Sequence, residues 1–270
     1  MINLIGTGLS DFKDLTLKAK ELIDDSDTVY LEVYTSKLKY NDYDLLKRDF
    51  KKIFDKELQL LFREDIENNE EKLIEQSKKH NVSILVIGDA ISATTHIGLI
   101  LNAKKNKIKI NIVHNASIFN TIAITGLQLY KFGKTASIVF PEQTENNKEF
   151  IPETPYRILH ENQSINAHTL FLLDIKIDKK TQKFMTPNEA IAILKKSDEL
   201  YDKNYNNKSM ITDKTKIIVC SRLGCDDEKI IYAPITKLIN HEFGNPLHCI
   251  IIPSALHFIE EEMLEQYKLK

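Results

Sequence analysis

The 270-residue sequence has no tryptophan, few cysteines and no long apolar run. Its three cysteines are Cys220, Cys225 and Cys249. An odd number without a Cys-x-x-Cys pair argues against a disulfide framework, and we expect these thiols in or near the core. No apolar run approaches the roughly 20 residues that span a bilayer, and residues 1–5 lack the charged and apolar regions of a signal peptide. We therefore expect a cytoplasmic protein without a membrane partner.

Neither sign of charge dominates, because 37 basic residues face 39 acidic ones and the formal net charge is −2. This balance gives no global attraction to nucleic acid, and we expect no such partner. The chain length suggests one large domain or two of ordinary size. The acidic triplet Glu260-Glu261-Glu262 falls in a helix predicted over residues 257–267, and we interpret the triplet as a solvated helix face.

The chain has only eight glycines, so a pair such as Gly6 and Gly8 is expected to meet a backbone requirement. The pair follows a strand predicted at residues 2–5 and precedes a helix predicted at residues 15–23. This order is typical of dinucleotide-binding folds. However, Asp11 stands where their fingerprint needs a third glycine, which disfavours a nicotinamide-dependent oxidoreductase.

A second apolar run, residues 82–87, ends abruptly in Gly88-Asp89 and has the composition of a strand buried on both faces. The hydroxyl residues Ser92, Thr94 and Thr95 are predicted to cap the helix that follows. Ligands of open α/β sheets bind outside the carboxyl ends of the strands, so this corner is a candidate site. Taken alone, an ordinary strand-to-helix turn explains the pattern equally well.

Strands alternate with helices over residues 1–113, which predicts an α/β domain with a parallel sheet. The last of these strands ends in a polar cluster, in which we interpret His114 as a packed, hydrogen-bonded core histidine. Ser117 is predicted to cap a helix over residues 119–130. Residues 114–270 contain strands joined by connections of mixed length, which indicates an α+β domain.

Several motifs of known chemistry are missing. The sequence has no Gly-x-Ser-x-Gly elbow, no P-loop and no histidine pair at metal-ligand spacing. These absences argue against a serine hydrolase, a P-loop phosphotransferase and a metal site. The residues by themselves therefore indicate a two-part α/β protein with a ligand cleft, without a metal.

Blocks spread over nearly the whole chain resemble one family of methyltransferases. These blocks are Leu4–Leu9, Gly88-Asp89 with Ser92–His96, His114–Ile118, Thr125–Lys134, His168–Leu170 with Leu172–Lys176, Gly224 with Asp226-Asp227, Pro246–His248 and Leu256–Phe258. The chain resembles the diphthine synthase family, a branch of the tetrapyrrole-methylase-like enzymes that use S-adenosylmethionine. The Ser-Ala-Thr-Thr-His and Gly-Leu-Gln-Leu-Tyr-Lys-Phe-Gly blocks are specific to this branch. The chain departs from the pattern at Ala90, where the family has proline, and over residues 141–167, which match poorly.

The resemblance implies two α/β domains of tetrapyrrole-methylase type, with a parallel sheet in residues 1–113, a mixed sheet in residues 114–270 and the cofactor in a cleft between them. It implies a homodimer that methylates the amino group of the modified histidine of translation elongation factor two, giving diphthine. The implied cofactor is S-adenosyl-L-methionine, with S-adenosyl-L-homocysteine as product. Carried over by motif, the implied cofactor-binding residues are Leu9, Asp89, Ser92, Ser117, Ile118, Leu173, Leu223 and His248.

Methyl transfer from a sulfonium is an in-line displacement that depends on proximity and alignment, not on a metal or a covalent nucleophile. The missing motifs are consistent with this chemistry. The substrate amine must lose a proton before it attacks, and the sequence identifies no base. The number of methyl groups stays open, as do two alternatives: methylation of a tetrapyrrole ring, and a cofactor-binding protein without catalysis.

Overall fold

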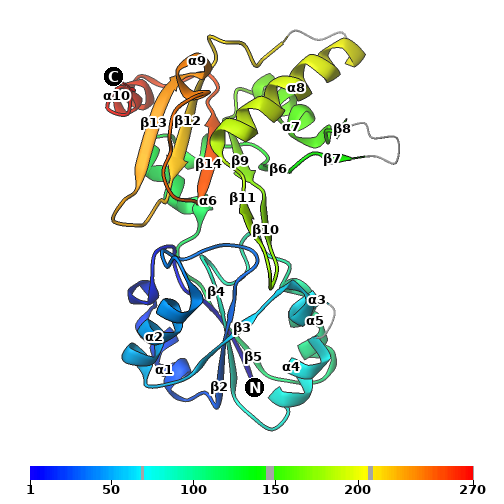
Figure 1. Ribbon diagram of the computed structural model, residues 1–270, viewed down its shortest axis with the longest axis vertical. Coiled ribbons are helices and arrows are strands. Elements are labelled where there is room, and N and C mark those ends of the chain that lie inside the picture. Colours follow the sequence, from blue (N-terminus) through cyan, green and yellow to red (C-terminus); the bar gives the residue numbers. More distant parts are fainter. Residues whose placement is uncertain (68–69, 144–148, 206–208, 270) are drawn as a thin grey trace. The chain divides into compact units, whose positions relative to one another are not determined.

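The computed structural model of the protein describes residues 1–67, 70–143, 149–205 and 209–269 (Figure 1). Its packing divides the chain into two compact units. Unit 1 comprises Met1–Thr121 together with Ile175–Lys183, and unit 2 comprises Ile122–Asp174 together with Phe184–Lys270. Each unit is built around its own sheet.

The division falls after Thr121, whereas the sequence suggests one after residue 113. Asn115 explains why the segment beyond the fifth strand stays with unit 1. Its side-chain amide donates to the carbonyl oxygens of Gly6 and Asp14, both at 3.0 Å. These bonds tie the loop after the strand back to the first loop of the chain.

Unit 1 has a five-stranded sheet in the order β3-β2-β4-β1-β5, and every neighbouring pair is parallel. Its strands are β1 (Ile2–Gly6), β2 (Thr28–Glu32), β3 (Leu58–Leu61), β4 (Val82–Val86) and β5 (Ile110–Val113). Its helices are η1 (Phe12–Asp14), α1 (Leu17–Asp24), α2 (Tyr43–Phe54), α3 (Arg63–Glu67), α4 (Glu70–Ser77), α5 (Ile97–Lys105) and α6 (Ile118–Thr121). The predicted parallel sheet is confirmed.

Helices cover both faces of this sheet, with α1 and α2 on one side and α3, α4 and α5 on the other (Figure 1). Side chains along a strand point alternately to its two faces. In β1, Leu4 packs in the cluster that contains Leu73 and Leu99 from α4 and α5. The next residue, Ile5, packs with Phe50 of α2. The apolar runs of β1 and β4 therefore reflect burial on both faces.

Unit 2 has a mixed five-stranded sheet in the order β13-β12-β14-β9-β6, in which only β6 and β9 pair in parallel. Its strands are β6 (Ala136–Ile138), β9 (Thr169–Leu173), β12 (Lys216–Ser221), β13 (Lys229–Pro234) and β14 (His248–Ile252), and a short separate pair is β7 (Glu142–Gln143) with β8 (Glu149–Phe150). Its helices are η2 (Ile122–Thr125), η3 (Leu129–Lys131), α7 (Thr154–Ser164), α8 (Pro187–Tyr205), α9 (Ile235–Leu238) and α10 (Phe258–Glu265). The mixed sheet is confirmed.

A two-stranded ribbon of β10 (Ile175–Ile177) and β11 (Gln182–Phe184) leaves unit 2 after β9. Its residues up to Lys183 pack with unit 1, where the Lys179 ammonium lies 5.9 Å from the centre of the Phe62 ring.

The helix predicted over residues 119–130 is wrong. The segment contains α6 and then the short turns η2 and η3. The α-helix ends at Thr121, and η2 ends just before Gly126, which has a φ of +84°. A β-carbon at Gly126 would come within 2.5 Å of the Met263 side chain. Only glycine tolerates that conformation and that approach without strain. The close contact with α10 therefore prevents the helical stretch from continuing through residue 126.

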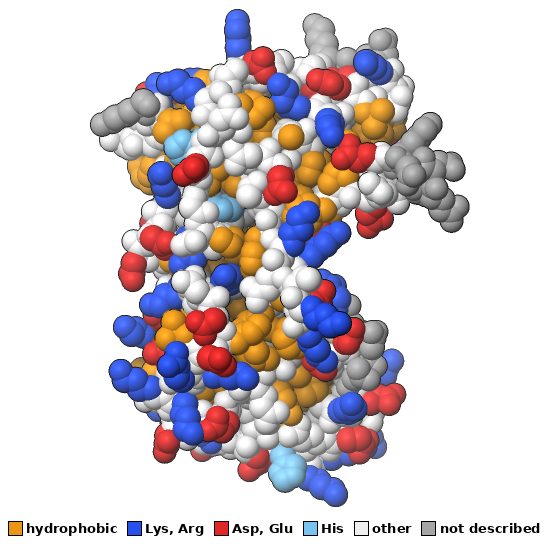
Figure 2. Space-filling model, viewed as in Figure 1, with side chains coloured by type: hydrophobic (Ala, Val, Ile, Leu, Met, Phe, Trp, Pro, Cys, Tyr) orange, Lys and Arg blue, Asp and Glu red, His pale blue; other side chains and the backbone are white. Residues whose placement is uncertain are grey.

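Other sequence predictions are confirmed. All three cysteines are free and buried. The Thr186 hydroxyl accepts a hydrogen bond from the Glu189 amide at the start of α8, as its position before Pro187 predicts. Among the described helices, none combines the length and apolarity needed to cross a membrane. On the face that Figure 2 shows, basic and acidic side chains are interspersed.

Candidate functional site

Three loops of unit 1 meet at the carboxyl ends of β1, β4 and β5. Gly8 and Gly88 pair through two backbone hydrogen bonds, of 3.1 Å from the Gly8 amide and 2.8 Å from the Gly88 amide. A β-carbon on Gly6 would lie 2.7 Å from the Gly88 carbonyl oxygen, so the first loop needs glycine to come this close. The prediction that the Gly6 and Gly8 pair meets a backbone requirement is therefore confirmed at Gly6, where a larger residue would collide with the Gly88 backbone.

The Asp89 carboxylate lies at the centre of these loops and is 5 % exposed. Its Oδ1 accepts the amides of Ile91 (3.1 Å) and Ser92 (3.0 Å) and the Ser92 hydroxyl (2.8 Å). Its Oδ2 accepts the Asn115 amide at 3.1 Å and lies 2.9 Å from His114 Nδ1. Burial tends to raise the pKa of Asp89, but these hydrogen bonds outweigh it and lower the pKa to about 2. The carboxylate is therefore ionised at neutral pH.

The predicted capping of α5 by hydroxyl side chains is wrong. The N-cap residue is His96, and its side chain makes no capping hydrogen bond. Ser92 instead donates its hydroxyl to Asp89, and the Thr95 hydroxyl lies 3.1 Å from the Tyr34 hydroxyl. Ala93 has a φ of +56°, so the chain turns between Asp89 and the helix. The hydroxyl residues shape the loop and do not start the helix.

The interpretation of His114 as a packed core residue is also wrong, because its side chain is 66 % exposed and is held by Asp89. Asn115, which sequence reasoning did not single out, joins the first and third loops. The signal for both was present, since polar residues directly after an apolar strand are unusual unless they have partners at the sheet edge.

Five of the eight residues that the resemblance implies lie in these loops of unit 1. Ser117 is buried, and its carbonyl oxygen accepts the amides of Asn120 and Thr121 as α6 begins. We call Leu9, Asp89, Ser92, Ser117 and Ile118 the unit 1 group. Within it the structure shows a hydrogen bond between Asp89 and Ser92, and Ile118 is the first residue of α6.

The other three residues lie at one edge of the unit 2 sheet. His248 begins β14 and is opposite Ser221, the last residue of β12. Leu223 follows two residues later and is buried. Leu173 is the last residue of β9, and β9 pairs with the edge of β14 that faces away from β12. The unit 2 group is therefore Leu173, Leu223 and His248.

His248 is electrically neutral at pH 7. Burial lowers its pKa to about 4, and the positive charge of Arg222 acts in the same direction. Its Nδ1 lies 2.8 Å from the Ser221 hydroxyl, which fixes the ring. The unit 2 group therefore presents a polar but uncharged imidazole.

A small, partly open pocket lies in unit 1 beside the end of β4. Its walls are mainly apolar, with a few polar side chains. They include Val33, Leu38, Tyr43, Leu46 and Ile87 from the body of unit 1, and Ile177 and Gln182 from the β10–β11 ribbon. Since Ile87 directly precedes Gly88, this pocket lies next to the start of the loop that follows β4.

A buried carboxylate that sequence reasoning missed lies at the end of β2. Glu32 is fully buried and accepts the amides of Tyr34 and Thr35, at 2.5 and 2.7 Å. Burial raises its pKa, although these hydrogen bonds act in the opposite direction. The imidazole of His96, from the branch-specific block, lies 3.9 Å away. A charged residue within an apolar strand was the available signal.

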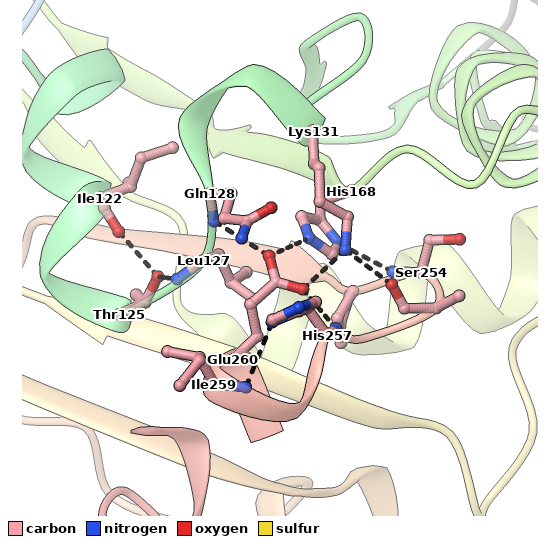
Figure 3. A network of polar contacts seen from close by, with 12 residues as sticks. Ile122, Thr125, Leu127, Gln128, Lys131, His168, Ser254, His257, Ile259 and Glu260 are labelled. Carbon is pink, nitrogen blue, oxygen red and sulfur yellow. Dashed lines mark hydrogen bonds and ion pairs between the residues drawn. The ribbon is translucent and has the colours of Figure 1, made fainter. Parts of the chain in front are cut away.

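Glu260 contradicts the prediction of a solvated acidic face, because it is fully buried. It accepts hydrogen bonds from the amides of Gln128 (3.0 Å) and His257 (2.7 Å), from Lys131 Nζ (2.6 Å) and from His168 Nε2 (3.1 Å), as Figure 3 shows. Burial tends to raise the pKa of Glu260, but these bonds lower it to about 2. The network holds the branch-specific block 125–134 against α10.

One group of side chains has the composition of a metal site. In α7 and α8, His160 Nε2 lies 3.9 Å from Asp198 and 3.7 Å from Asp202. Both carboxylates already accept hydrogen bonds, from Ser209 and from Tyr156. We interpret the group as a cluster of polar side chains that joins the two helices.

Known proteins agree with this organisation. Residues 1–239 match the family model described as Tetrapyrrole (Corrin/Porphyrin) Methylases. The diphthine synthase of Methanocaldococcus jannaschii is 42 % identical, over 98 % of both chains. An Arabidopsis thaliana relative, whose name assigns it to diphthine methyl ester synthesis, is 35 % identical over 100 % of this chain and 99 % of its own. A crystal structure from Entamoeba histolytica, assigned to diphthine synthase, has a TM-score of 0.86 at 33 % identity and covers 100 % of this chain and 99 % of its own. The chain therefore belongs to the tetrapyrrole methylase family, within its diphthine synthase branch, and is a methyltransferase.

Proposed function

We propose that the protein transfers methyl groups from S-adenosyl-L-methionine to the amino group of the modified histidine of translation elongation factor two, giving diphthine. The observation that carries this proposal is the ionised, nearly buried Asp89 at the junction of three strand-end loops. The names of full-length relatives support the choice of substrate. We further propose that the enzyme is a homodimer and acts in the cytoplasm, where this partner works.

The residues present fit such a cofactor. S-adenosylmethionine supplies an electrophilic methyl group on a positively charged sulfonium. Asp89 provides the negative charge that a cationic ligand needs, and a shielded carboxylate exerts a stronger field than an exposed one. His248 stays neutral and adds no opposing charge. Both properties favour a cation over a phosphate-bearing ligand.

We assign the remaining contacts by their chemistry. Aliphatic side chains cannot form hydrogen bonds, so Leu9, Ile118, Leu173 and Leu223 would contribute backbone groups and apolar contact. The amides around Ser117 lie where a chain turns into a short helix. We therefore propose the unit 1 group and the unit 2 group as the cofactor-binding residues.

The test is calorimetric titration with S-adenosylmethionine, which carries the sulfonium charge, followed by mass spectrometry of elongation factor two after incubation with the same cofactor. Asp89→Asn keeps the volume but removes the charge, and we expect affinity to fall at least tenfold, as loss of about 1.4 kcal/mol implies. Asp44→Asn, an exposed aspartate in the first turn of α2, is the matched control. Unchanged affinity in Asp89→Asn would remove the assigned role, and an unmodified elongation factor would overturn the substrate.

A further inference from the structure

The His114 imidazole is aligned by Asp89 and open to solvent on its outer side. Nδ1 lies 2.9 Å from Asp89 Oδ2, while two-thirds of the side chain is exposed. Because the pKa of Asp89 is about 2, its carboxylate has no proton to donate. The hydrogen atom in this bond must belong to Nδ1, so in the neutral ring Nε2 carries the free lone pair.

Its position in the chain places the ring among the candidate cofactor residues. His114 directly follows β5, one residue before Asn115 and three before Ser117. Asp89 is bound both to this loop and to the loop that carries Ser92. The open nitrogen of His114 is thus held by the same carboxylate that we assign to the methyl donor.

We propose that His114 is the general base that removes a proton from the substrate ammonium before each methyl transfer to nitrogen. This inference rests on the proposed function and adds the residue that the reaction otherwise lacks. Nε2 takes one proton, and the freed nitrogen lone pair forms the N–C bond. The C–S bond breaks with its electron pair remaining on sulfur, and the imidazolium then releases its proton to water.

Asp89 has a positioning role in this scheme. It fixes the tautomer and orientation of the ring, as carboxylates do for catalytic histidines. Among the described residues, Asp89 is the charged side chain within ion-pair distance of His114. Asp14 contacts the neighbouring Asn115 through its backbone carbonyl oxygen, and its carboxylate accepts the Ser10 amide.

Substitution with asparagine isolates the function of the base. The side-chain nitrogen of asparagine can take the place of Nδ1 and still donate to Asp89, but it cannot accept a proton. For His114→Asn we expect unchanged affinity for S-adenosylhomocysteine, and nitrogen methylation slowed about 10²–10⁴-fold at pH 7, the usual contribution of a general base. The rate of the variant should rise tenfold per pH unit as the substrate ammonium loses its proton to water.

Mass spectrometry of elongation factor two provides an internal control. A carboxylate has no proton to lose, so any methyl ester formed by the enzyme should form equally fast in His114→Asn. Nitrogen-15 NMR of labelled histidine gives a readout apart from turnover: His114 should show protonated Nδ1 and unprotonated Nε2, and Asp89→Asn should mix the tautomers. A wild-type rate and pH profile in His114→Asn would overturn the base while leaving the proposed function intact. Absence of transfer by the wild type would overturn both.

Discussion

Replacing Glu260 by glutamine tests how much the buried carboxylate of Glu260, which binds the branch-specific block of unit 2, contributes to the free energy of unfolding. Glutamine has nearly the same shape, but one oxygen becomes an NH₂ group. That group would face donors such as Lys131 Nζ or the amide of His257. The substitution therefore removes a negative charge and places two hydrogen-bond donors next to each other, but it creates no cavity.

The magnitude follows from the pKa of Glu260, which is lowered from 4.5 to about 2. One pKa unit corresponds to about 1.4 kcal/mol, so the network stabilises the folded protein by about 3 kcal/mol at pH 7. This value agrees with the typical cost of breaking a buried ion pair, which is about 3–5 kcal/mol. Because the pKa is lower in the folded state, this stabilisation is complete above the unfolded pKa near 4.5 and is lost as the pH falls towards 2. At pH 3 less than half of this stabilisation, roughly 1 kcal/mol, should remain.

The assay is urea denaturation at pH 7 and pH 3, followed by circular dichroism. Hydrogen exchange of peptides covering residues 122–134 and 254–265 would assign the change to unit 2. Glu262→Gln is the matched control, since Glu262 lies in the same helix and is exposed. A loss below 1 kcal/mol in Glu260→Gln at pH 7, or a loss that stays equal at pH 3, would refute the reasoning.

Two further predictions concern Gly126 and metals. Gly126→Ala should destabilise the protein by about 1–3 kcal/mol, because a β-carbon would collide with Met263 and the left-handed conformation disfavours alanine. Gly98→Ala in α5 is the control in the same denaturation experiment, since a β-carbon there meets nothing within 4 Å. Dialysis against a chelator should leave methyl transfer unchanged, because an in-line displacement from a sulfonium needs no metal; an activity that falls and returns with added divalent cation would contradict this.

The sequence predicted those features that local pattern determines. Apolar runs at β1 and β4 mark strands of a sheet covered on both faces, and the Thr186-Pro187 pair marks the start of α8. Such signals depend on neighbours within a few residues. Block-by-block resemblance then indicated which strand ends matter. The structure joins the ends of β4 and β5 at Asp89 and ties the end of β1 to them through Gly8 and Asn115.

The errors arose where the partner is distant in the chain. Glu260, Glu261 and Glu262 look alike locally, yet Glu260 alone is buried, because it meets an amide 132 positions earlier. His114 depends on a carboxylate 25 residues before it. No periodicity within a window of 10 to 20 residues contains such contacts.

The β10–β11 ribbon makes both units discontinuous in sequence. The chain passes between them after Thr121, after Asp174 and again after Lys183. No single cut can release either unit intact, and a chain that stops at residue 121 lacks a strip of unit 1, including the Ile177 and Gln182 walls of its pocket. During synthesis, unit 1 can be completed only after β6, α7 and β9 of unit 2 have been made. Neither unit of this enzyme can therefore be deleted, exchanged or duplicated as one contiguous segment of the gene. Each unit can fold completely only when parts of the other have also been synthesised.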